Sequence, residues 1–214
     1  MRLKNIRINI EKTLSNRFSE IYFSIRLIDV DVHVSRNFPI LLKNLEEDGV
    51  WDINSLTENH IIRAYREFFW QIGTDPTKIR PSSEALIRRF LKWNTIPTIN
   101  NVVDAGNVAS MTTMIPIGLY DADLIDEYLQ LRFASQGERF EDIVGNESIL
   151  KNDQILLADK SGPIHIFLHR DSRRTMIRNT TKRVLIVGCG VQNVDRELVE
   201  MAVDEVVSLL PKLS

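Results

Sequence analysis

The chain has 214 residues, of which 43% are hydrophobic and 26% are charged, so it is long and apolar enough to bury a substantial core. Its formal net charge is -2, so the composition as a whole gives no attraction to nucleic acid, and such a partner needs a local basic patch. No stretch reaches the roughly 18–20 consecutive apolar residues of a membrane span, so we expect a cytoplasmic protein with no membrane partner. Cys189 stands alone in an apolar run and is expected to be a small buried hydrophobe.

The first third of the chain predicts one strand and one helix. Residues 21–34 are rich in β-branched and aromatic residues, and the valines of 30–34 alternate with polar residues, as in a half-buried strand. Ser55 and Glu58 have the spacing of a capping box at the start of a helix, and Gly73 is the expected C-cap.

This first helix carries an aromatic cluster made of Tyr65, Phe68, Phe69 and Trp70. Such a cluster can form a platform on which bases stack. At helical spacing it is more typical of packing, and we assign it to the core.

A second helix is predicted after the irregular segment 74–83, with Ser82 or Ser83 as its N-cap. Glu84 lies four residues before Arg88 on this helix, so we expect a surface ion pair that adds little stability.

The remaining chain predicts a polar, half-apolar segment and then several strands. Residues 98–121 combine asparagines, aspartate and glycines with apolar residues, and loops of this composition often carry functional sites. Strands are predicted near 129–133, at 154–168 around a turn, and at 184–191, before a terminal amphipathic helix from Asp195 to Leu210. We therefore predict an α/β (α+β) fold, a single domain over 1–214 with helices packed on mixed, mainly antiparallel sheets.

Two motifs suggest a cofactor or metal, and both have a plainer interpretation. Gly188 and Gly190 mimic a dinucleotide fingerprint, but Asn193 replaces the third glycine and no strand follows the last helix. His165 and His169 would lie roughly 13 Å apart in a strand, too far to share a metal ion. We predict no metal and no cofactor, and His169 stays a candidate acid or base by residue type.

Charge is segregated along the chain. Basic residues dominate 60–95 and 165–183, whereas acidic residues dominate 121–160. We expect the two basic segments to share one face and to bind phosphates of tRNA rather than DNA. The candidate nucleic-acid-binding residues are Arg88, Arg89, Arg170, Arg173, Arg174 and Arg178.

The runs RPSSEALIRRF and INNVVDAGNVASMTTMIPIGLYD resemble the tRNA-editing (B-three/B-four) domain of the phenylalanyl-tRNA synthetase β chain, and its free-standing relatives. The resemblance covers residues 60–190, and 1–59 and 191–214 are expected to complete the core. It implies a module that binds tRNA and hydrolyses the ester of a mischarged amino acid. The synthetase's catalytic chain and anticodon-binding domain have no counterpart here, so we do not expect a complete tRNA ligase.

The resemblance also implies site residues. It suggests Asn107, Glu138 and Arg132 as catalytic, and as substrate-binding Arg80, Asn100, Asn101, Asp104, Pro116, Gly118 and Asp159. We expect the segment from Pro97 to Asp121 to line a concavity walled by the strands that contain Arg132 and Asp159.

Two positions depart from the synthetase pattern. Gly106 stands where that pattern has threonine, and Gly118 stands where it has histidine. Glycine at position 118 predicts a roomier pocket with one hydrogen-bond donor fewer, and therefore weak activity on tyrosyl-tRNA(Phe).

Three interpretations are open at this point. The first is a stand-alone module that hydrolyses an aminoacyl-tRNA in trans. The second is a binder of RNA or an amino acid without catalysis. The third is a small-molecule hydrolase or sensor on the same fold, because a fold alone does not fix function.

Overall fold

The computed structural model describes residues 5–18, 20–47, 49 and 51–213. The helices are α1 (Lys12–Arg17), α2 (Phe38–Glu47), α3 (His60–Gln71), α4 (Ser82–Trp93), α5 (Asn101–Thr113) and α6 (Arg196–Leu209). The first strands are β1 (Arg7–Ile10), β2 (Tyr22–Asp29), β3 (Ile117–Asp121), β4 (Tyr128–Phe133) and β5 (Arg139–Glu141). The later strands are β6 (Glu147–Ile149), β7 (Ile155–Asp159), β8 (Gly162–Ile166), β9 (Arg170–Asp171) and β10 (Arg183–Gly190).

The strands form mixed, mainly antiparallel sheets, so the predicted α/β class is confirmed. One sheet has the order β1-β4-β7-β8-β9, a second has the order β2-β10-β3, and β5 pairs with β6. β1 runs parallel to β4, whereas the other strand pairs of the described residues are antiparallel.

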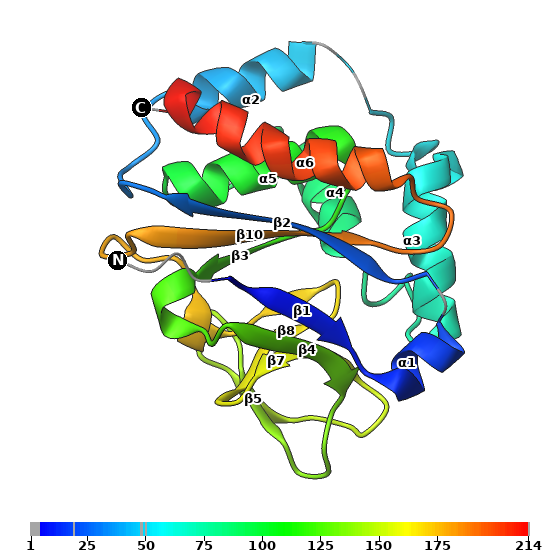
Figure 1. Ribbon diagram of the computed structural model, residues 1–214. Coiled ribbons are helices and arrows are strands. Elements are labelled where there is room, and N and C mark those ends of the chain that lie inside the picture. Colours follow the sequence, from blue (N-terminus) through cyan, green and yellow to red (C-terminus); the bar gives the residue numbers. More distant parts are fainter. Residues whose placement is uncertain (1–4, 19, 48, 50, 214) are drawn as a thin grey trace.

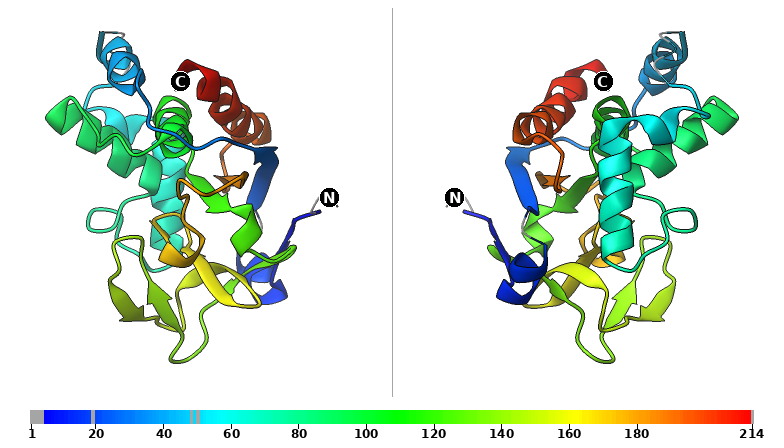
Figure 2. Two further views of the ribbon diagram at one scale, coloured as in Figure 1. Left: turned by 90° about the vertical axis from the view of Figure 1, so that its left-hand side faces the viewer. Right: turned by 90° about the vertical axis from the view of Figure 1, so that its right-hand side faces the viewer.

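The elements stack in layers (Figures 1 and 2). Helices α2, α4, α5 and α6 cover one side of the β2-β10-β3 sheet, and the five-stranded sheet lies on its other side. α3 runs along one flank and contributes to the core between the sheets through Tyr65, Phe68 and Phe69. A second core lies between the three-stranded sheet and the helices, around residues such as Ile87 and Ile186. Two cores therefore sandwich the central sheet.

The glycines of β10 allow close packing. β10 is antiparallel to both neighbours, so Gly188 and Gly190 do not belong to the parallel βαβ unit of a dinucleotide site. A Cβ at Gly190 would overlap the ring of Tyr22, and one at Gly188 would come within 2.8 Å of Val203. Cys189 between them is buried, as expected, and burial raises the pKa of its thiol.

Local differences from the sequence predictions have identifiable causes. The strand β2 ends at Asp29, and residues 30–34 of the predicted strand lie outside any strand, although the backbone N–H of Val30 still donates to the carbonyl of Lys182 at 2.8 Å. α3 is capped by Asn59, whose side chain accepts from the backbone N–H of Ile61 at 2.9 Å, so Ser55 is not its cap. Gly73 adopts the left-handed conformation after the helix, as expected of a C-cap. Trp70 is 57% exposed, so its assignment to the core is wrong.

Neither Ser82 nor Ser83 caps α4 through its side chain. The N-cap is Pro81, and the backbone N–H of Ser82 donates to the carbonyl of Leu168 at 2.9 Å. This bond satisfies one donor at the start of the helix through a tertiary contact instead of a side-chain cap. It also ties the start of α4 to the segment that follows β8.

Candidate functional site

A cavity of about 560 Å³ opens between α4 and α5. α5 lines it with Val103, Gly106, Asn107 and Ser110, which form one stripe at helical spacing. α4 faces them with a stripe of the same spacing, made of Ser82, Ala85, Leu86 and Arg89. Two helices thus present their i, i+3, i+4 and i+7 positions to a common space.

The other walls come from distant parts of the chain. β3 contributes Ile117 and Leu119, and further apolar surface comes from Ile143, Met176 and Ile177. Polar surface comes from two residues after β8, His169 and Asp171. The cavity therefore has mostly apolar walls and a few polar groups, which is typical of a site for a small organic ligand.

Among the titratable groups that line this cavity, His169 has a strongly shifted pKa. Burial, and secondarily the neighbouring His165, lower its pKa from the ordinary 6.5 to about 4. At neutral pH the imidazole is therefore uncharged and can accept a proton or a hydrogen bond. Asn107, half-buried on α5, adds an amide that can donate and accept.

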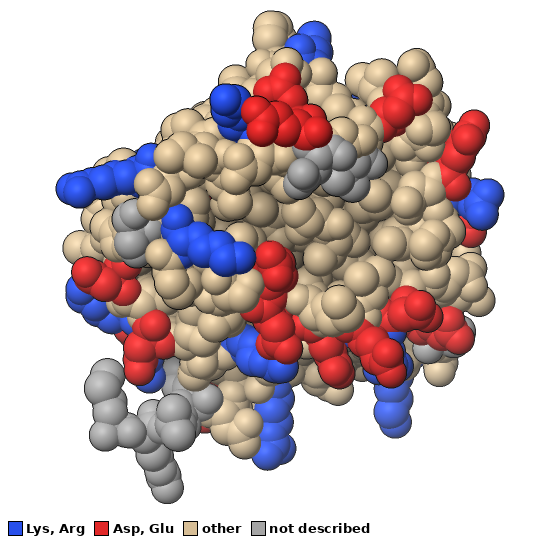
Figure 3. All heavy atoms as spheres, turned by 90° about the horizontal axis from the view of Figure 1, so that it is seen from above, with Lys and Arg blue, Asp and Glu red and all other residues tan. Residues whose placement is uncertain are grey.

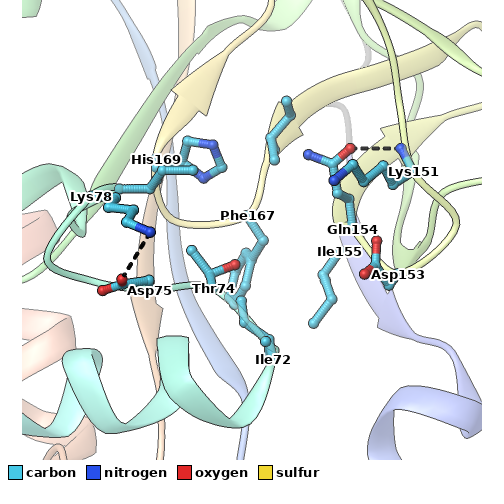
Figure 4. Close-up of a pocket in the computed structure, with 13 residues that line it drawn as sticks. Ile72, Thr74, Asp75, Lys78, Lys151, Asp153, Gln154, Ile155, Phe167 and His169 are labelled. Atoms are coloured by element: carbon cyan, nitrogen blue, oxygen red, sulfur yellow. Dashed lines mark hydrogen bonds and ion pairs between the residues drawn. The ribbon is translucent and has the colours of Figure 1, made fainter.

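A second cavity, of about 410 Å³, lies beside the first and shares His169 with it (Figure 4). The segment after α3 contributes Thr74, Asp75 and Lys78, and the segment before β7 contributes Lys151 and Asp153. Figure 4 shows these two groups on opposite sides of the space, with the Asp75–Lys78 ion pair at 3.7 Å. His169 thus forms part of the wall of both cavities.

Three predicted substrate-binding residues at the start of α5 form hydrogen bonds with backbone groups and do not line this cavity. The side chain of Asn100 caps the helix by accepting from the N–H of Val103 at 2.9 Å. Asn101 donates to the carbonyl of Asp31 at 3.0 Å. Asp104 is fully buried and accepts from the N–H of Ile99 at 3.0 Å, and burial raises its pKa. Their buried positions anchor the start of α5.

Gly118 and Pro116 lie outside the cavity lining because side chains alternate along β3. Ile117 and Leu119 face the cavity, so Gly118 faces the core between the sheets. A Cβ at Gly118 would overlap the hydroxyl of Tyr120, so the expectation of a roomier pocket at this glycine is wrong. Pro116 is buried, and its carbonyl accepts from the N–H of Cys189 at 3.1 Å.

The strands that carry Arg132 and Asp159 do not wall the cavity of Asn107, contrary to our expectation. Arg132 makes a two-pronged ion pair with Glu138, with distances of 2.6 and 2.8 Å. Arg132 and Asp159 line another hollow, beside β1. β4 and β7 belong to the five-stranded sheet, whereas Asn107 lies on the far side of the three-stranded sheet. The structure therefore does not bring Arg132 or Glu138 to Asn107.

The ion pair between Glu84 and Arg88 is not a surface pair. The side chain of Glu84 is fully buried, and it accepts from Nε of Arg88 at 2.7 Å and from Nη1 of Arg66 at 2.9 Å. Arg80 lies 3.8 Å from the same carboxylate, so this predicted substrate-binding residue belongs to the cluster. The expectation of a weak, exposed pair is wrong because Arg66 of α3 and Arg88 both bind the buried carboxylate.

The two basic segments adjoin at the Ser82–Leu168 bond, but acidic side chains neutralise most of their predicted nucleic-acid-binding arginines. Arg170 pairs with Asp142 at 3.6 Å, Arg173 with Glu141 at 3.2 Å, and Arg174 with Asp159 at 2.7 Å. Arg178 donates to a backbone carbonyl, that of Arg173. On the helical side of the molecule, Lys and Arg are interspersed with Asp and Glu around a largely uncharged centre (Figure 3).

Arg89 is the one predicted nucleic-acid-binding arginine among the described residues that line this cavity. It is exposed, it lines the cavity, and it makes no ion pair with an acidic side chain of the described residues. Its guanidinium is therefore available to an anionic group of a ligand at the cavity mouth.

Sequence reasoning missed two features of this site. The stripe of Val103, Gly106, Asn107 and Ser110 has regular helical spacing, and that spacing could have identified the face of α5 that meets the cavity. No local pattern places Asp171 in the lining of the same cavity as Asn107, because the two residues come from distant segments of the chain. None of the helices in the described part of the chain is long and apolar enough to cross a membrane.

The chain was compared with known proteins. Its residues 64–214 match the model of the B3/4 domain. It is similar to the phenylalanine–tRNA ligase β subunit of Protochlamydia amoebophila, with 30% identity over 90 residues, or 42% of this chain and 11% of the relative. It is also similar to the same subunit of Lactobacillus acidophilus, with 33% identity over 122 residues, or 56% of this chain and 15% of the relative.

This chain thus spans only a small part of the length of these curated relatives. Among solved structures, an N-terminal fragment of the phenylalanyl-tRNA synthetase β subunit from Pyrococcus horikoshii aligns with 98% of this chain and 49% of that fragment. The identity is 16% and the TM-score is 0.46. The match of the family model to more than half of the sequence shows that the chain belongs to the B3/4 domain family.

Proposed function

We propose that this chain binds the aminoacylated end of a tRNA in the cavity between α4 and α5, and that it hydrolyses the ester of a mischarged amino acid in trans. The observation that carries the proposal is that Asn107 and a neutral His169 line one cavity whose other walls are mostly apolar. The apolar walls suit an amino-acid side chain, and the two polar groups suit an ester and a water molecule. The similar proteins are tRNA ligase subunits, which supports the choice of tRNA.

The proposed reaction is the attack of water on the ester carbonyl. The amide N–H of Asn107 donates to the carbonyl oxygen, which becomes negatively charged in the tetrahedral intermediate. The imidazole of His169 takes a proton from the attacking water and gives it to the departing ribose oxygen, which leaves as the ribose hydroxyl. The products are the free amino acid and the uncharged tRNA, so atoms and protons balance.

The test is a panel of aminoacyl-tRNAs incubated with the purified chain. We expect one class of aminoacyl-tRNA to lose its amino acid faster than in buffer alone, with a first-order dependence on protein. Absence of protein-dependent release for every aminoacyl-tRNA of the panel would contradict the proposal.

A second candidate function is the binding or hydrolysis of a small aminoacyl compound without tRNA. The observation that favours it is the neutralisation of Arg170, Arg173 and Arg174 by acidic partners, which leaves less positive charge for phosphates. Uncharged tRNA distinguishes the two functions. Binding that weakens steeply with salt supports the first, and absence of binding at low salt supports the second.

A further inference from the structure

Asp171 gives the cavity between α4 and α5 a negative group in a defined position. It is the one carboxylate among the described residues that line this cavity, and its side chain is 37% exposed. It lies in the short strand β9, where it pairs with His165 of β8. The strand pairing fixes the backbone from which this carboxylate projects.

Two neutral donors hold the carboxylate of Asp171. The backbone N–H of Leu168 donates to Nε2 of His165 at 2.9 Å, so Nε2 is an acceptor and the proton of this ring lies on Nδ1. Nδ1 is 2.8 Å from Oδ1 of Asp171 and donates to it. The Tyr120 hydroxyl also hydrogen-bonds with Asp171, and burial, with a further contribution from Asp171, raises the pKa of this phenol.

These hydrogen bonds orient the carboxylate and leave its charge uncompensated. Among the described residues, no lysine or arginine forms an ion pair with Asp171. The neighbouring His169 is uncharged at neutral pH because its pKa is lowered to about 4. Arg89 is the one permanently charged cation of the lining, and it projects from α4. The cavity thus combines one oriented anion, one cation and apolar walls.

An α-aminoacyl ester of a nucleotide has the complementary groups. Its α-ammonium is a cation next to the ester, its side chain is in many cases apolar, and the nucleotide carries phosphate. We propose that Asp171 binds the α-ammonium group, so that the site accepts ligands with a free amino group and rejects those that are N-acylated. This inference rests on the proposed function for the class of ligand, and it adds the group that determines specificity.

N-acylation should weaken binding for two physical reasons. It removes the positive charge that forms a charge-assisted hydrogen bond with the carboxylate. It also places an uncharged amide and an additional acyl group next to the carboxylate. The carboxylate then loses bound water without gaining a cationic partner, which is unfavourable.

The test uses non-hydrolysable probes, so that binding is measured apart from hydrolysis. The probes are 3′-aminoacylamino-3′-deoxyadenosines that carry phenylalanine, tyrosine, leucine or valine, each with a free and with an N-acetylated amino group. For the probe that binds best we expect the free form to bind at least about tenfold more tightly than its N-acetyl form, by calorimetry. In Asp171→Asn this ratio should fall close to one.

Asp153→Asn is the matched control, because Asp153 lines the second cavity and not this one. It should keep the wild-type ratio. Equal binding of free and N-acetylated probes to the wild-type protein would overturn the inference without any variant, and so would an unchanged ratio in a folded Asp171→Asn. Binding of none of the probes would contradict the proposed function, and this inference with it. Binding without hydrolysis of the matching aminoacyl-tRNA would contradict only the hydrolytic function.

Discussion

The carboxylate of Glu84 on α4 accepts hydrogen bonds on both of its oxygens from Nη1 of Arg66 on α3, at 2.9 and 3.1 Å. Arg88 completes the cluster at 2.7 Å, and the Glu84 side chain is fully buried. This contact joins the helix that lines the ligand cavity to the helix that flanks both sheets. It positions α4 and, through α4, one wall of the cavity.

We therefore expect Glu84→Gln to destabilise the protein strongly. Removal of the carboxylate leaves two mostly buried arginines without their counterion, which typically costs roughly 3–5 kcal/mol. Urea denaturation measures the change in the free energy of unfolding. Glu67→Gln is the control, because Glu67 forms an exposed pair with Arg63 at 4.0 Å, for which the loss should stay below about 1 kcal/mol. Equal losses in the two variants would contradict a structural role for the buried cluster.

The lowered pKa of His169 predicts a pH dependence of stability. In the unfolded chain this histidine has its ordinary pKa of 6.5, and in the folded chain the value is about 4. The unfolded state therefore binds a proton first as the pH falls, and the free energy of unfolding should decrease from about pH 6.5 down to about pH 4. Above about pH 6.5 the histidine is uncharged in both the folded and the unfolded state, so its protonation no longer lowers the free energy of unfolding. In His169→Gln the decrease between these pH values should be smaller, and an identical pH profile would show that the histidine is not desolvated.

Gly118→His should not restore a synthetase-like site. Position 118 faces the core between the sheets, where a Cβ would overlap the hydroxyl of Tyr120. We expect overpacking to lower the free energy of unfolding, typically by about 1–3 kcal/mol, and with it the melting temperature, and we expect no gain in the hydrolysis of tyrosyl-tRNA(Phe). Gln130→His, at an exposed position of β4, is the matched control and should melt like the wild type. Faster hydrolysis by a stable Gly118→His would place this residue in the site after all.

The resemblance places Arg132 and Asn107 in one catalytic site, whereas the structure places them in different regions, and Arg132→Gln tests which is correct. The residue pairs with Glu138 in the five-stranded sheet and is absent from the lining of the cavity that holds Asn107. We expect a loss of stability and an unchanged rate constant for aminoacyl-tRNA hydrolysis at a temperature where the variant is folded. A large loss of rate in a folded Arg132→Gln would instead support a catalytic role for this pair.

Sequence reasoning predicted those features that depend on local pattern. Apolar periodicity predicted the helices α3, α4 and α6 and the strands β4, β7, β8 and β10. The Asn107 segment was singled out by its composition, but it was expected to resemble a loop, whereas residues Asn101–Thr113 form the helix α5. The geometry of the site depends on contacts between segments that are distant in the sequence, and hydrophobic periodicity does not predict such contacts. Because side chains alternate along β3, Gly118 lies outside the cavity lining, and Glu84 is buried in an ion pair with Arg66 from the distant helix α3. His169 was noticed for its residue type, but only the fold places it in the lining of the same cavity as Asn107.

The central claim is that Asn107 takes part in ester hydrolysis in the cavity between α4 and α5. Single-turnover deacylation of the preferred aminoacyl-tRNA by wild type and Asn107→Ala tests it most directly, with Asn152→Ala as a control at an exposed turn outside this cavity. We predict that Asn107→Ala loses on the order of 100-fold in rate while its melting temperature stays near that of the wild type, and that Asn152→Ala keeps the full rate. A folded Asn107→Ala that releases the amino acid as fast as the wild type would contradict the claim.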